Sequence, residues 1–131
     1  MSVKPSESPD QAQYINLTTY RKDGRAVVTP VWVVAHGGKA YAYTLRDTYK
    51  VKRLRSNPRV RMVACDIQGK REWGPHWAGT GRVVEEPELM REVYAAFGAK
   101  YGLIYRLMTL MRWLRRGLSD RALLELDCKA E

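Results

Sequence analysis

The sequence predicts a mainly β protein, a small antiparallel barrel of about six strands with flanking helices. Three features predict this class: short strand-like stretches, turn signals between them, and one stretch, 27–34, that is apolar on both faces. The chain has 131 residues, 45% of them hydrophobic, which suffices for one domain with one core. Because no repeat or linker interrupts it, we expect a flexible tail over 1–13 and one domain over 14–131.

The first half of the chain has the pattern of a three-stranded antiparallel meander. A short helix is expected over 10–16, ahead of the strands. Two turn signals, Asp23-Gly24 and Gly37-Gly38, supply the positive φ that tight hairpins need. The strands are expected over residues 17–21, 27–34 and 40–44.

The stretch 27–34 is expected to be the central strand. A strand that is apolar on both faces is normally buried on both faces. Pro30 cannot donate a ladder hydrogen bond, so the strand must be bulged or paired on one side only at that point. The backbone near Thr29 and Val31 would then be free to meet something other than a strand. The alternative is a plain core strand that tolerates a proline.

The second half alternates helices and strands. The helix over 101–116 carries leucines at helical spacing, and Gly117 is its expected cap. The other helices are expected over 50–57, stopped before Pro58, and from Pro87 to about Phe97-Gly98. Strands are expected over 59–66, 77–84 and 122–127, with a loop over 67–76.

Several classes of function find no support in the residues. His36 and His76 are the only histidines, and neither has a carboxylate or cysteine in a catalytic spacing. No metal-ligand spacing is present, and Cys65 and Cys128 are expected to be free thiols, as in the cytosol. There is no apolar run long enough for a membrane span and no secretory signal at the N-terminus, so we expect a cytoplasmic protein. If the protein is an enzyme, a bound cofactor must carry the chemistry.

The segment between Thr44 and Arg55 has the strongest site signal. The net charge of +9 favours an anionic partner, and this segment joins a strand end to a helix N-terminus. Asp47 or Thr48 could cap that helix, which places Lys50 in its first turn beside unpaired backbone N–H groups. Such an arrangement predicts an anion site, with the Thr44 hydroxyl as a further donor. The alternative is a solvated basic helix.

In order along the chain, short motifs resemble the pyridoxamine 5′-phosphate oxidase-like superfamily, and within it the actinobacterial branch of F420-dependent oxidoreductases. The similarity runs from about Tyr14 to Leu126, and its most specific part is the lysine helix followed by Asn57-Pro58-Arg59-Val60. The other motifs are Leu17-Thr18-Thr19, Asp23-Gly24-Arg25, Thr29-Pro30-Val31-Trp32-Val33, Lys50-Val51-Lys52-Arg53-Leu54 and Gly79-Thr80-Gly81. The arginine and histidine motifs of the oxidases of vitamin synthesis are not found, so that activity is not expected.

The resemblance implies a split β-barrel homodimer with a cofactor at the subunit interface. The cofactor would be coenzyme F420, a deazaflavin, or alternatively FMN. The implied activity is hydride transfer between the reduced coenzyme and an unsaturated small organic substrate; the alternatives are an FMN-dependent reductase and a cofactor-binding protein without turnover. The candidate cofactor-binding residues are Thr29, Pro30, Val31, Trp32, Thr44, Lys50, Lys52, Arg53 and Trp77. No catalytic residue and no metal ligand is assigned.

The helix over 101–116 looks like an insertion of a subgroup that covers the active site. Its arginines beside a leucine stripe also allow contact with a membrane surface, which is the less favoured alternative. No nucleic-acid partner is expected.

Overall fold

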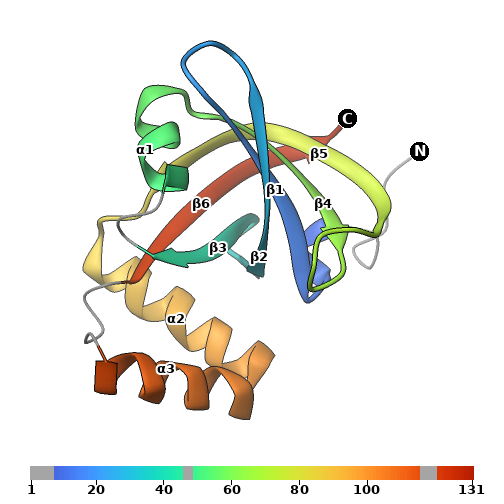
Figure 1. Ribbon diagram of the computed structural model, residues 1–131. Helices are drawn as coiled ribbons and strands as arrows, with labels where there is room; N and C mark the ends of the chain where they lie inside the picture. The colour runs from blue at the N-terminus through green and yellow to red at the C-terminus, as the bar shows by residue number, and fades with distance from the viewer. Residues whose placement is uncertain (1–7, 46–48, 116–120) are drawn as a thin grey trace.

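Six antiparallel strands close into a barrel in the computed structural model, which describes residues 8–45, 49–115 and 121–131 (Figure 1). Around the barrel their order is β1-β2-β3-β6-β5-β4, so the last strand lies between the third and the fifth. The strands are β1 (Tyr14–Tyr20), β2 (Ala26–His36), β3 (Lys39–Leu45), β4 (Arg59–Cys65), β5 (Glu72–Val83) and β6 (Arg121–Ala130). The predicted mainly β barrel is confirmed, and it has the form of a split barrel.

The described residues also form three α-helices and one short 3-10 helix. The α-helices are α1 (Tyr49–Ser56), α2 (Pro87–Tyr101) and α3 (Leu103–Arg115). The 3-10 helix η2 (Pro9–Gln11) buries Pro9, although these residues were assigned to the tail. Among the described residues, no helix is long and apolar enough to cross a membrane.

The first three strands form the predicted meander. Gly24 has φ 89°, and Gly37 and Gly38 have φ 57° and 82°, as the two tight turns require. The prediction of a helix over 10–16 is wrong beyond η2, because β1 already begins at Tyr14. That strand pairs with both β2 and β4, and this long-range pairing outweighs the local helix signal.

Strand β2 is paired on one side only along its first half. All of Ala26–Trp32 pairs with β1, whereas pairing with β3 begins at Trp32. Pro30 therefore lies where no partner is needed on its second side, as predicted. The expected burial of both faces is wrong within this chain: Val28 is 53% exposed, since β2 projects beyond the end of β3.

Strand β5 begins at Glu72, inside the segment predicted as a loop. Met62 pairs with Trp77 but Ala64 pairs with Trp73, so β5 carries extra residues opposite β4 as a bulge. Pro75 is tolerated in the bulge because pairing with β6 begins only at Trp77.

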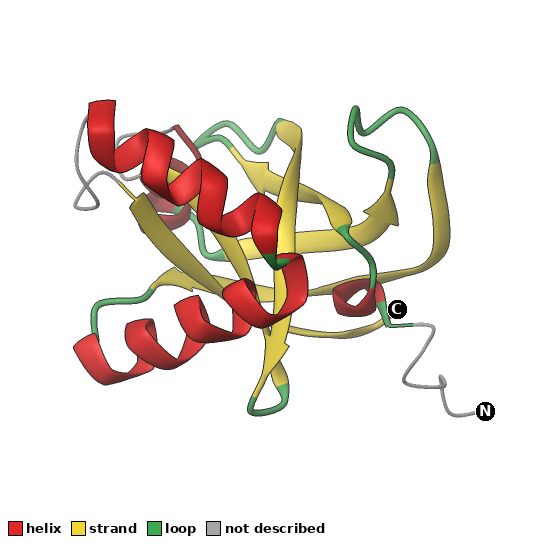
Figure 2. Ribbon diagram, turned by 90° about the horizontal axis from the view of Figure 1, so that it is seen from below, coloured by secondary structure: helices red, strands yellow, loops and turns green. Residues whose placement is uncertain are grey.

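Apolar side chains gather in two layers. One fills the barrel interior, with Ile15, Leu17 and Val60 fully buried. The other lies around Phe97 and Tyr105, between the barrel wall and the helices α2 and α3. Figure 2 shows these two helices on the same side of the barrel. The helices are thereby fixed on one side of the barrel.

The boundary between α2 and α3 differs from the prediction. Helix α2 continues through Gly98 to Tyr101, and Gly102 with φ 59° is its cap. Helix α3 confirms the second predicted helix, but its leucine stripe faces outward, with Leu103 81% exposed. The predicted caps Asp47, Thr48 and Gly117 lie outside the described residues.

Candidate functional site

A cavity of about 310 Å³ lies where β2, β3, α1 and α3 meet. This volume is at the lower end of the range typical of small-molecule sites, about 300–1,000 Å³. Its wall combines apolar and aromatic side chains with Thr44, near the end of β3, and one lysine, Lys50. The lining residues are Tyr14, Pro30, Val31, Trp32, Tyr43, Thr44, Lys50, Ile67, Met108 and Thr109.

The open half of β2 supplies one wall. Pro30 and Val31 line the cavity from the segment that has no β3 partner. The indole of Trp32 is held by stacking on Tyr101, with ring centroids 4.5 Å apart and planes 13° apart, and by an edge contact with Tyr43. Because Tyr101 itself bonds to the backbone of Val33, this aromatic wall is rigid.

Lys50 is the cation of the cavity. It is the second residue of α1 and is half-buried. Burial, together with the positive charge of Arg53, lowers the pKa of its ammonium. Among the described residues no carboxylate lies within ion-pair distance of Lys50. An ammonium in this position is poised to bind an anionic group of a ligand.

A second hollow, of about 570 Å³, lies beside α1 at the β1–β2 turn. It is lined by Tyr20, Arg21, Lys22, Lys52, Arg53 and Ser56. Arg53 is fixed there by donating from Nε to Thr19 Oγ1 at 2.6 Å, and burial, with a contribution from Arg21, lowers its pKa. Four of the six lining residues are cationic, so this hollow is also suited to anions.

The structure divides the predicted binding residues among several places. Pro30, Val31, Trp32, Thr44 and Lys50 share the cavity wall. Lys50 and Arg53 were both predicted to bind the cofactor, but they line different hollows.

The remaining predicted residues lie elsewhere. Lys52 lines the second hollow with Arg53, and Thr29 pairs with Leu17 outside both hollows. Trp77 packs against the barrel core, where its Nε1 has no hydrogen-bond partner within the described chain.

Sequence reasoning missed residues that reach both hollows from distant parts of the chain. Ile67, Met108 and Thr109 line the cavity, and no local pattern connects them to Lys50. Arg21 and Lys22 could have been noticed, because they are basic residues beside the Asp23-Gly24 turn.

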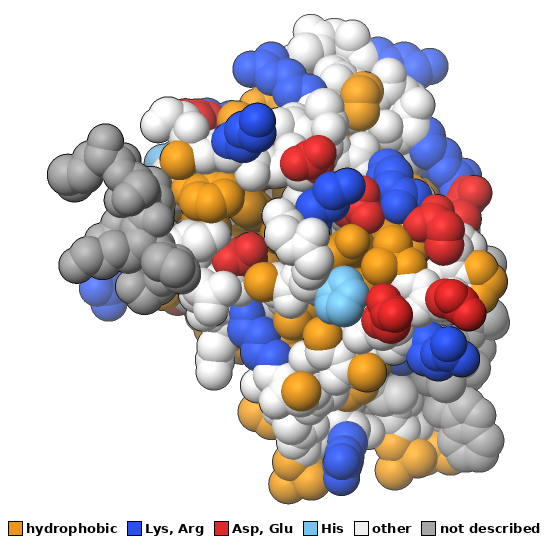
Figure 3. Space-filling view, turned by 180° about the vertical axis from the view of Figure 1, so that it is seen from behind, with side chains coloured by type: hydrophobic (Ala, Val, Ile, Leu, Met, Phe, Trp, Pro, Cys, Tyr) orange, Lys and Arg blue, Asp and Glu red, His pale blue; other side chains and the backbone are white. Residues whose placement is uncertain are grey.

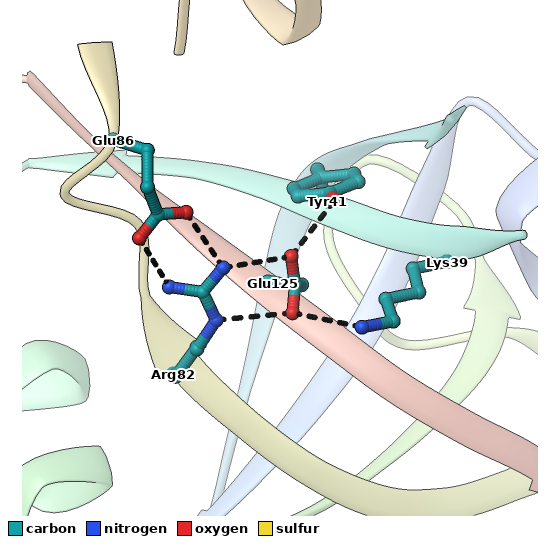
Figure 4. Close-up of polar contacts among 5 residues, drawn as sticks. All are labelled: Lys39, Tyr41, Arg82, Glu86 and Glu125. Atoms are coloured by element: carbon teal, nitrogen blue, oxygen red, sulfur yellow. Dashed lines mark hydrogen bonds and ion pairs between the residues drawn. The ribbon is translucent and has the colours of Figure 1, made fainter. Parts of the chain in front are cut away.

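A third group of charges is balanced internally. The buried Glu125 accepts hydrogen bonds from Arg82, Tyr41 and Lys39, and Arg82 also binds Glu86 through two bonds of 2.8 Å (Figure 4). Burial opposes ionisation of Glu125, but these donors outweigh it and lower its pKa. Burial and Glu125 raise the pKa of Tyr41 to about 12. The cluster leaves no charge for a ligand.

No histidine or cysteine is among the described residues that line the cavity. His36 contacts Glu92 at 3.2 Å on the helix side of β2, and neither histidine lines the cavity. Burial raises the pKa of Cys65 to about 11 and that of Cys128 to about 12, so both stay as unreactive thiols. Within the described part of the chain no cluster of His, Cys, Asp or Glu could hold a metal ion.

The closed six-stranded barrel, with a half-paired strand and a lysine at one cavity, defines a split-barrel protein suited to a small anionic ligand. The family described as pyridoxamine 5′-phosphate oxidase matches residues 6–130. The chain therefore belongs to this family. No curated protein matches its sequence.

Solved structures support the same fold at low sequence identity. HutZ, a heme storage protein from Vibrio cholerae, is 20% identical with a TM-score of 0.71, and the match covers 98% of this chain and 92% of HutZ. The conserved hypothetical protein Rv2991 from Mycobacterium tuberculosis is 19% identical with a TM-score of 0.72, over 98% of this chain and 82% of that one. A heme-binding protein from Mycobacterium smegmatis is 16% identical with a TM-score of 0.62, over 99% and 59% of the two chains.

Proposed function

We propose that the protein is an oxidoreductase that uses coenzyme F420 to transfer a hydride to an unsaturated organic substrate. The observation that carries the proposal is Lys50, a half-buried cation without a carboxylate partner among the described residues, in a cavity with a rigid aromatic wall. The family supports a flavin-type cofactor. When bound, the reduced deazaflavin would supply the hydride.

The lining residues fit such a cofactor. Pro30 and Trp32 offer an apolar surface to a flat ring system, and Val31, whose side chain packs in the barrel core, lines the cavity between them. Lys50 would hold a phosphate, with the Thr44 side chain on the same wall. Met108, from α3, also lines the cavity and would help to shield the ring from water. A proton donor is not assigned.

The distribution of charge favours the deazaflavin over FMN. Coenzyme F420 carries a carboxylate-rich tail in addition to its phosphate, so it is the more anionic of the two. The second hollow, with Arg21, Lys22 and Arg53, offers a place for that tail. The overall charge of +9 would attract it at long range. FMN remains the alternative ligand.

Heme is a second candidate ligand because HutZ and the Mycobacterium smegmatis protein have similar folds. Heme iron usually needs an axial His, Cys, Met or Tyr ligand. Tyr14, Tyr43 and Met108 line the cavity, whereas His36 and His76 do not. The cavity thus lacks the commonest ligand, which supports the flavin-type cofactor.

We also propose that the protein works as a homodimer. The half-paired segment of β2 exposes Val28 and leaves a strand edge open next to the cavity. Covering this edge with a second subunit would satisfy its backbone and enclose the cofactor. Sedimentation of the purified protein at micromolar concentration should show a dimer, and a monomer would contradict this proposal.

Calorimetric titration of the purified protein with F420, FMN and hemin tests the ligand. We expect F420 to bind most tightly, with an affinity that falls as salt is added because exposed charges are screened. Tighter binding of FMN at every salt concentration would mean that FMN, and not F420, is the cofactor. Binding of hemin alone would overturn the oxidoreductase proposal.

A further inference from the structure

The outer face of α3 is an exposed hydrophobic surface. Ten large hydrophobic residues are exposed in the described part of the chain, and seven of them belong to this one helix. Their exposed fractions run from 47% to 81%. The seven, here called the α3 face, are Leu103, Ile104, Leu107, Met108, Leu110, Met111 and Leu114.

Apart from Met108, which also lines the cavity, the α3 face is directed away from the barrel. On the inner side of the helix, Tyr105 is buried against Phe97 and Trp32, and Thr109 lines the cavity. At about 100° per residue, the seven exposed residues occupy a continuous arc of almost half the circumference. In Figure 3 hydrophobic side chains gather along the lower edge of the molecule, where α3 lies in Figure 1. A surface of this kind normally has a partner.

The charge pattern of this region indicates which partner. The sequence of α3 has three cations, Arg106, Arg112 and Arg115, and no Asp or Glu. Pairing of this face with a second copy would bring arginines toward arginines, with no carboxylate on either helix to balance them. An anionic surface would instead match both the cations and the apolar residues.

We infer that α3 docks the protein on the surface of a membrane that contains anionic phospholipids. The helix has 13 residues, so its length of about 20 Å is too short to cross a hydrocarbon core of about 30 Å. It lies in the plane of the interface, with its exposed leucines among the acyl chains, and the positive charge of the helix favours anionic headgroups.

Vesicle flotation with the full chain tests this inference. The probes are vesicles of phosphatidylcholine alone and vesicles of equal parts phosphatidylcholine and phosphatidylglycerol. We expect binding to the mixed vesicles that is at least ~10-fold stronger than to phosphatidylcholine and that weakens with salt. Equal binding to both vesicles, or to neither, would overturn the inference.

Two matched variants separate the apolar face from net charge. Leu107→Glu/Leu110→Glu should weaken binding to mixed vesicles by at least ~10-fold, because it removes two apolar side chains that would insert among the acyl chains and adds two charges. Ala95→Glu/Ala99→Glu adds the same charges at exposed positions of α2 and should cost no more than ~3-fold. Equal losses in the two variants would mean that the α3 face does not insert.

A neutral variant shows whether loss of vesicle binding comes from the missing apolar surface and not from added charge or misfolding. Leu107→Gln/Leu110→Gln removes the apolar surface without adding charge, and its thermal melt should match that of the wild type, since both positions are exposed. It should still lose most of the vesicle binding. If it binds vesicles like the wild type but changes a dimer into a monomer in sedimentation, the α3 face is a self-association surface and the inference is wrong.

Discussion

The ion-pair cluster at Glu125 and the cavity at Lys50 differ in whether the charged side chain has a partner of opposite charge. Glu125 is surrounded by Arg82, Tyr41 and Lys39, and each of its oxygens has a donor. Lys50 shares the cavity wall with Pro30 and other apolar side chains, and its neighbouring charge, Arg53, is of the same sign. A charge balanced within the chain stabilises the fold, whereas a charge left unbalanced costs stability unless a ligand balances it.

The largest expected effect comes from breaking the balanced cluster. Glu125→Ala removes the shared acceptor of three donors and leaves Tyr41 buried without one. The free energy of unfolding should fall by about 2–3 kcal/mol, measured by urea denaturation. Glu88→Ala is the control, because Glu88 is 90% exposed and its contact with Arg91 is 4.0 Å, so it should change stability by less than about 0.5 kcal/mol. A similar loss in both variants would mean that the cluster does not stabilise the fold.

The next effect tests the unbalanced charge. Lys50→Ala should weaken cofactor binding about 10- to 100-fold, because a charge-assisted hydrogen bond contributes about 1.5–3 kcal/mol. The free energy of unfolding should stay equal or rise, since a desolvated cation is removed. Calorimetric titration measures the first and urea denaturation the second. Lys129→Ala, an exposed lysine on β6, is the control for binding. Unchanged affinity in Lys50→Ala would place the phosphate site elsewhere.

Lys100 is an intermediate case, a half-buried cation held by backbone carbonyls. Its ammonium donates to the carbonyl oxygens of Asp10, Ala12 and Val33 at 2.6–3.0 Å, and burial lowers its pKa to about 8. In the unfolded chain its pKa is about 10.4, so between these values the unfolded state binds the proton more tightly and stability rises with pH.

Comparing urea denaturation at mildly and strongly alkaline pH checks this. Over that range wild type should gain up to about 1 kcal/mol relative to Lys100→Met, after allowance for partial solvent exposure. A parallel pH dependence in both proteins would show that Lys100 keeps its ordinary pKa. The three carbonyl bonds would then balance the charge as completely as the partners of Glu125 do.

The smallest effect concerns the second hollow. Arg21→Ala/Lys22→Ala should weaken F420 binding by about 3- to 10-fold at low salt, because exposed charges contribute about 0.2–1 kcal/mol each. Binding of FMN, which has no carboxylate tail, should change by less than about 2-fold. The two ligands can be compared by titration at low and high salt. An equal loss for both would mean that this hollow does not discriminate between them.

Local signals predicted those parts of the fold that depend on few residues. Asp23-Gly24 and Gly37-Gly38 fixed the hairpins, and Pro30 correctly indicated one-sided pairing. The helix that carries Lys50 was also predicted, and with it the cation of the cavity.

Long-range packing decided the rest. The bulge near Pro75 lies where β5 pairs with β4 but not yet with β6, and no local pattern reveals this arrangement of distant strands. Periodicity predicted α3 but not the direction in which its leucines point. An apolar stripe has the same sequence pattern whether it packs on a core or faces outward, as it does here. The side chains that complete the cavity, such as Ile67 and Met108, depend on where loops and helices meet in space.

The place of β6 between β3 and β5 has a consequence for synthesis. Tyr41 on β3 pairs with Glu125 on β6, so the barrel cannot close until residues 121–130 have left the ribosome. Until then β3 and β5 both present unpaired edges, and the nascent chain carries an open sheet. Such late, distant pairing slows folding and prolongs exposure to aggregation. Translation stalled before Arg121 should therefore leave a chain that proteases digest readily, whereas release of the last strand should protect it.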